Sequence, residues 1–139
     1  SWIVGTRYSY ADWSFSVSEN PEVNESSAFF NDVTAKLNAR LTPTTNLGGS
    51  FLRSRDDFQL GDEARFDYST VSGEAYLKQL IGEKANLTLS VNKGRYESSL
   101  FDLKGNDQSK FTNAIDYTRG KVDFLYIVSD NYRLKIGAD

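Results

Sequence analysis

The sequence contains neither cysteine nor histidine. Without cysteine, the chain can form neither disulfides nor thiolate metal sites. Without histidine, it lacks the commonest general base, the commonest metal ligand and the middle member of a Ser-His-Asp triad. Carboxylate chemistry would remain, but nothing in the sequence fixes two carboxylates at one cleft. We therefore expect no enzyme activity, and no catalytic, cofactor-binding or metal site.

Strong charge of one sign and long apolar runs are missing as well. The net charge is -3 and the basic residues form no cluster, which disfavours nucleic acid as a partner. No stretch approaches the roughly 20 consecutive apolar residues of a membrane helix. The acidic loop residues do not match the spacing of an EF-hand loop. Strands of membrane barrels give a much weaker signal than a membrane helix, so these absences leave that class open.

Alternation with a period of two is the main positive signal. Aromatic residues make up 14% of the chain and only two residues are proline, a composition that suits pleated strands. Between Asp32 and Leu41, odd-numbered positions are apolar and even-numbered positions are polar. A helix would mix these two sets, whereas a strand separates them onto two faces. The segment is therefore predicted to be an amphipathic strand.

The same pattern elsewhere predicts an all-β fold, an antiparallel up-and-down meander of about seven strands. The strands are expected to be roughly 10–14 residues long, which exceeds the usual five or six. Tight turns near 42–46, 82–86 and 129–131 are predicted to alternate with long polar loops near 14–28, 58–66 and 98–113. Apolar stripes of eight to ten residues, roughly 26–33 Å, lie toward the tight turns. The strand ends near the long loops are expected to be polar on both faces.

These stripe lengths predict a transmembrane barrel, because strands tilted by about 40° would cross an apolar layer of about 25 Å. Two sets of side chains would then have different environments, one at the membrane interface and one in the lumen. Aromatic residues expected at the membrane interface are Trp2, Tyr8, Tyr10, Trp13, Tyr126 and Tyr132. Polar residues expected to face a wet lumen are Asp32, Lys36, Arg40, Glu74, Lys78, Lys121, Asp123, Arg133 and Lys135.

Three segments carry a family resemblance. Residues 1–13 (SWIVGTRYSYADW) and 29–38 (FFNDVTAKLN) resemble the early barrel strands of TonB-dependent outer-membrane receptors, especially the SusC-like type of Bacteroidetes. Residues 114–124, which begin AIDY and end KVDF, resemble a later strand of that family. The resemblance implies a barrel of about 22 strands with an N-terminal plug. Residues 1–139 have room for about seven strands, so we expect a partial barrel without plug or TonB box.

The resemblance also implies a function and a location. The chain would be a wall segment of a bacterial outer-membrane transporter that imports a nutrient with energy from TonB. Its partners would be outer-membrane lipid, the remainder of the barrel, a plug domain, TonB and a surface lipoprotein. The long loops would be extracellular and the tight turns periplasmic.

Two other interpretations stay open on the sequence. One is a passive porin or a structural barrel in a larger outer-membrane assembly. The other is a soluble β-sandwich binding module, in which one face of each strand covers a core and alternation is equally expected. Strand length and the one-sided distribution of long loops favour the barrel.

Overall fold

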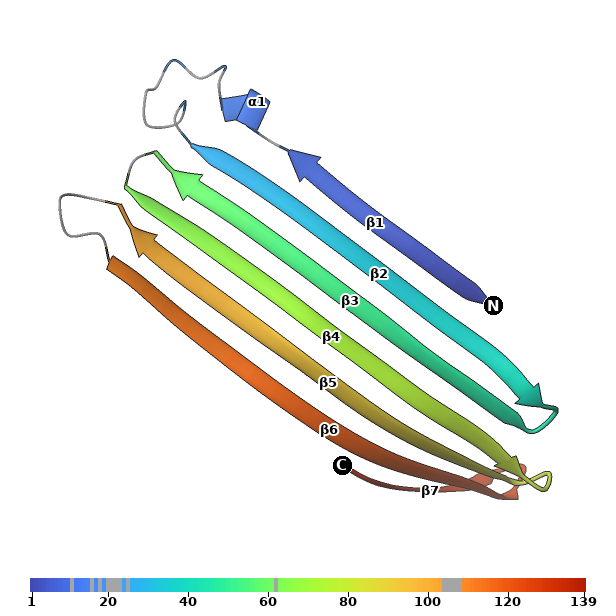
Figure 1. The fold of residues 1–139 in the computed structure, drawn as a ribbon. Coiled ribbons are helices and arrows are strands. Elements are labelled where there is room, and N and C mark those ends of the chain that lie inside the picture. Colours follow the sequence, from blue (N-terminus) through green and yellow to red (C-terminus); the bar gives the residue numbers. More distant parts are fainter. Residues whose placement is uncertain are drawn as a thin grey trace.

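The computed structural model describes residues 1–10, 12–15, 17, 19, 24, 26–61, 63–103 and 109–139. In this part of the chain, seven antiparallel strands follow one another in one open sheet (Figure 1). This confirms the prediction of an all-β up-and-down meander. The elements are β1 (Trp2–Tyr10), α1 (Asp12–Phe15), β2 (Ser27–Thr42), β3 (Thr45–Leu60), β4 (Ala64–Ile81), β5 (Ala85–Asp102), β6 (Ser109–Ser129) and β7 (Tyr132–Ala138).

The inner strands are longer than predicted. Strands β2 to β6 contain 16 to 21 residues, against the expected 10–14. Pairing of β3 with β4 runs without a break from Thr45↔Gln79 to Leu60↔Ala64. The ladders therefore continue well past the apolar stripes, into segments that the sequence predicted to be polar strand ends or loops.

The long loop predicted at 58–66 is wrong. Strand β3 continues to Leu60 and β4 begins at Ala64. Phe58 and Phe66 are direct partners across the two strands, with ring centroids 6.5 Å apart. Arg65, whose direct partner is Gln59, donates diagonally across the strands from Nε to Oδ1 of Asp57 at 3.1 Å. Such cross-strand pairs stabilise a hairpin. The segment is therefore a paired strand despite its polar composition.

Of the other two predicted loops, one stays long and one shortens. Strand β1 ends at Tyr10 and β2 begins at Ser27, which confirms a long connection near 14–28, with helix α1 at its start. Strand β5 reaches Asp102 and β6 resumes at Ser109, so much of 98–113 is strand, while residues 104–108 lie outside the described part. A strict alternation of tight and long connections is therefore wrong. The predicted tight turns do lie together at one end of the sheet, at 43–44, 82–84 and 130–131 (Figure 1).

One of these turns depends on a glycine. Gly82, between β4 and β5, has a φ of 61°, in the left-handed region that other residues seldom adopt. A Cβ at this position would meet no heavy atom within 4 Å, so backbone conformation alone favours glycine there.

The sheet has only one layer. Among the described residues, the buried hydrophobic side chains are Ala28 and Ala85, and no large side chain is fully buried. The accessible surface is 10255 Å², whereas a compact monomer of this mass would expose about 7,200 Å². The described strands thus do not form the two packed sheets of a β-sandwich. None of the helices in the described part is long and apolar enough to cross a membrane.

Candidate functional surfaces

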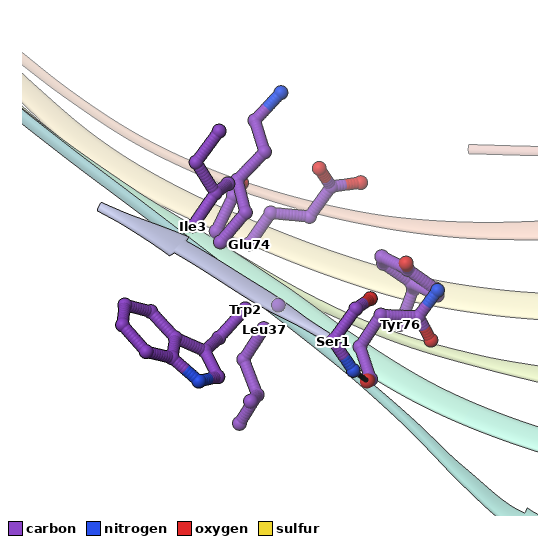
Figure 2. A pocket seen from close by; sticks show the side chains of 10 residues that line it. Ser1, Trp2, Ile3, Leu37, Glu74 and Tyr76 are labelled. Carbon is purple, nitrogen blue, oxygen red and sulfur yellow. Dashed lines mark hydrogen bonds between the residues drawn. The ribbon is translucent and has the colours of Figure 1, made fainter. Parts of the chain in front are cut away.

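Strand register divides the side chains between two faces. Residues that are direct partners on adjacent strands share a face, and neighbours along a strand lie on opposite faces. We call the face with Trp2 and Leu37 face A, and the face with Ile3 and Glu74 face B. Figure 2 shows these side chains pointing away from the sheet in two opposite directions. Each face changes its chemical character between the end with the tight turns and the other end.

Face A is apolar over the half near the tight turns. The side chains stay accessible: Leu37 is 60% exposed, Leu89 39% and Ile136 59%. On β4 the one polar member is Gln79, whose Oε1 accepts a hydrogen bond from Thr45 at 2.7 Å near the turn. We call this surface the apolar band; its larger members are Leu37, Leu41, Leu47, Phe51, Val71, Leu77, Ile81, Leu87, Leu89, Val91, Val122, Phe124, Leu134 and Ile136.

Face B is mainly polar opposite the apolar band, although it also carries Ile3, Leu52, Leu80, Leu125 and Ile127. All nine residues predicted to face a lumen lie on this face, on β2, β4, β6 and β7. Lys121 Nζ lies 2.7 Å from Asp123 Oδ2, and Arg7 of β1 pairs with Asp32 at 2.5 Å. Asp32 also accepts a hydrogen bond from Ser54 at 2.6 Å. The common face follows from register; that this face lines a lumen stays a prediction.

The predicted interface aromatics occupy different levels. Tyr126 and Tyr132 lie on face A beside the tight turn at 130–131. Trp2 is the partner of Leu37. Along the strand direction it therefore lies within the apolar band, away from the band's two ends. Tyr8 is further from the turns, and its ring contacts Phe29 edge-on with centroids 5.2 Å apart. Trp13 is in α1, and the side chain of Tyr10 lies outside what the structure describes.

Beyond the apolar band, the two faces exchange character. The sequence predicted strand ends polar on both faces, and this is wrong for face B. There Phe58, Phe66, Leu100 and Phe111 are successive partners across β3, β4, β5 and β6. The signal was present in the sequence as continued alternation in the opposite phase. We call these four residues the aromatic row, after its three phenylalanines; Leu100 is its aliphatic member.

The far half of face A carries charges. Arg55 Nη2 lies 2.6 Å from Asp67 Oδ2, and Arg95 lies 2.9 Å from Glu97 and 3.3 Å from Asp116. These pairs are exposed, and each contributes little to stability.

Arg65, near the start of β4, makes three hydrogen bonds to Asp57. Its hydrogen bonds to Asp57 raise the pKa of its guanidinium, against a smaller lowering by burial. The charges of this half make it a polar surface.

Two glycines on face B accommodate tyrosine rings from the next strand. The Tyr76 ring lies over Gly48, and the Tyr117 ring lies over Gly94, where a Cβ would overlap each ring. Gly48 and Tyr76 are direct partners, as are Gly94 and Tyr117. Packing of an aromatic ring over a cross-strand glycine helps to fix strand register.

Hollows in the sheet are shallow. One of about 440 Å³ lies at the free end of β1 and is lined from both faces, as Figure 2 shows for Trp2 and Glu74. Another, of about 460 Å³ on face B, lies between Glu74, Tyr117 and Lys121. Within the described residues, no group of three acidic side chains could hold a metal ion.

No family model, curated protein or solved structure matches this chain. Function is therefore inferred from the two faces of the sheet and from the resemblance of its strand sequences.

Proposed function

We propose that residues 1–139 form part of the wall of a transmembrane β-barrel in the bacterial outer membrane. The observation that carries the proposal is the apolar band, which is exposed on one face of a single-layer sheet and backed by a polar face. A bilayer has no water to satisfy backbone groups, so it accepts sheets only when their strands are paired in a closed barrel. The interior strands of this sheet are paired along their length.

The dimensions of the apolar band support a membrane. On β4 the band extends from Ile81 to Val71, ten residues along the strand. At 3.4 Å per residue this is roughly 34 Å. With a tilt of about 40° the band would cover roughly 26 Å along the membrane normal, close to the apolar height of about 25 Å in such barrels.

The positions of the tight turns give an estimate of the strand tilt that is independent of the length of the apolar band. Strand β4 continues two residues beyond Gln79, the partner of Thr45 at the start of β3. Strand β6 continues three residues beyond Tyr126, the partner of Ala85 at the start of β5. Each step spans two strands, or about 9.6 Å sideways for roughly 7–10 Å along the strands. If the turns share one rim, the strands tilt by about 35–46°, which agrees with the 35–45° of outer-membrane barrels.

Beyond the apolar band, face A becomes charged and face B carries the aromatic row. This change supports strands that extend past the membrane on the side away from the tight turns. Outside the bilayer, face A would meet water, which suits its ion pairs, and face B would enclose the aromatic row. We therefore propose that the tight turns lie in the periplasm and the other end lies outside, as in barrels with short periplasmic turns.

Labelling of single cysteines tests the membrane proposal, because the chain has no cysteine of its own. Leu89→Cys and Ser90→Cys are neighbours on β5 that lie on opposite faces. In vesicles containing brominated lipid, an environment-sensitive fluorophore at position 89 of the complete protein is expected to be quenched several-fold more than one at position 90. Equal quenching would contradict a membrane-facing band, and a folded, detergent-free monomer would favour the soluble binding module.

The transport function rests on the resemblance to TonB-dependent receptors. We propose that the complete protein imports a nutrient too large for porins, with TonB, a plug domain and a surface lipoprotein as partners. In cells that express this protein and grow on such a nutrient, deletion of TonB is expected to abolish that growth. Unchanged growth without TonB would favour a passive porin, and growth without the protein itself would favour a structural barrel.

A further inference from the structure

A hollow on face A lies where the apolar band meets the charged half. Its volume is about 430 Å³, and its lining includes Phe51, Val71, Gly73 and Lys93, together with the ion-paired Arg95 and Asp116. Phe51 and Lys93 are the two direct partners of Gly73 on the adjacent strands, so Gly73 forms the floor between them. The hollow thus has an apolar side toward the band, and its other side carries Lys93 and the Arg95–Asp116 ion pair.

Local packing does not explain the glycine at position 73. A Cβ there would meet only the Ser50 carbonyl oxygen, at 3.7 Å, which is an ordinary van der Waals contact. The backbone of Gly73 also lacks a positive φ. The structural effect of this glycine is therefore to keep the hollow open.

Among the described residues, one cation without an ion pair, Lys93, lines the hollow as the partner of Gly73 on β5, and a second, Arg53, lies outside its lining as the direct cross-strand partner of Val71 on β3. Both are exposed, and neither takes part in an ion pair within the described residues. The neighbouring Arg95 is different, because Glu97 and Asp116 already hold its guanidinium. Lys93 and Arg53 are thus the cations free to bind a phosphate, which both residue types favour.

We propose that this hollow binds the phosphate headgroup of an outer-leaflet membrane lipid, with Lys93 and Arg53 as its ligands. The hollow opens onto the apolar band, along which the acyl chains would lie. Basic side chains at the edge of a membrane lay their stems along apolar surface and place their charges at the headgroups. A free anion would use the two cations but not the band. The inference rests on the proposed membrane location.

Fluorescence titration of the complete protein in neutral detergent with dansyl-labelled phosphatidylglycerol tests the site. Lys93→Gln and Arg53→Gln are each expected to weaken binding about fivefold, as removal of one membrane-surface cation does. Gly73→Leu, which fills the hollow without changing charge, is expected to weaken binding at least as much. Lys110→Gln is the matched control, because Lys110 lies on the same face but beside Phe101 near the 103–108 connection.

Three results would overturn the site: equal weakening by Lys110→Gln, equal affinity for dansyl-labelled phosphatidylcholine, or displacement of the lipid by an equal concentration of inorganic phosphate. The last would indicate an anion site instead of a lipid site. The labels at positions 89 and 90 separate this failure from that of the membrane proposal. Selective quenching at 89 with unchanged lipid affinity would reject the headgroup site alone, whereas equal quenching would reject both.

Discussion

Replacing Leu89 with arginine is expected to remove about 2–4 kcal/mol of folding free energy from the complete protein in a bilayer. Leu89 lies in the apolar band, with Leu77 and Val122 as its partners on the two adjacent strands. An arginine at the membrane midplane of an outer-membrane barrel costs this amount, because its charge must leave water or distort the lipid around it. Urea unfolding of the protein in vesicles, followed by tryptophan fluorescence, would measure the loss.

Thr88→Arg is the matched control for Leu89→Arg. Thr88 is the preceding residue on β5, lies on face B and has Asp123 as one of its partners. An arginine there would lie between the cation Lys78 and the carboxylate Asp123, whose opposite effects offset each other, so a change within about 0.5 kcal/mol is expected, as for most surface substitutions. Equal losses from both substitutions would argue that neither face meets lipid.

Replacing Gly49 with alanine is expected to destabilise the sheet by about 1–3 kcal/mol, the usual effect of forcing a methyl group into a filled space. A Cβ at Gly49 would lie 2.9 Å from the carbonyl oxygen of Glu74 on β4. That oxygen belongs to the backbone and cannot rotate away as a side chain could, so β3 and β4 would have to separate locally. The midpoint of urea unfolding would report the loss.

Gly120→Ala provides the comparison within the same sheet. A Cβ at Gly120 on β6 would meet nothing within 4 Å. Alanine restricts the unfolded chain more than glycine does, so this substitution is expected to be neutral or to stabilise by up to about 1 kcal/mol. A loss at Gly120 as large as that at Gly49 would show that glycine is needed in these strands for a reason other than the contact with Glu74. Neither outcome depends on a membrane.

The turn-side half of the sheet could be predicted from sequence because strand alternation is a local property. Lys36 and Arg40 share a face simply because even-numbered positions of one strand do so. Register then places Glu74 and Lys121 on the same face. The sequence predicted these as one polar set without knowing any cross-strand contact.

The far half could not be predicted in the same way, because its strands depend on partners distant in sequence. The charged segment from Arg53 to Asp57 is predicted as a polar strand end, whereas the segment from Phe58 to Arg65 is predicted as a loop. The latter is mostly strand, because the backbones of β3 and β4 pair as far as Leu60↔Ala64. The opposite phase of alternation was visible at Phe58, but the charged residues around it concealed that signal.

Pairing between chain neighbours alone has a consequence for how this protein can change in evolution. Strand order follows chain order throughout the described sheet, so each hairpin contacts only the strands before and after it. Insertion or loss of a whole hairpin would leave every remaining strand running in its original direction, with its side chains on their original faces. Loss of a single strand would reverse the direction of all later strands and move their tight turns to the opposite end. Growth of such a sheet is therefore expected to proceed by duplication in pairs of strands.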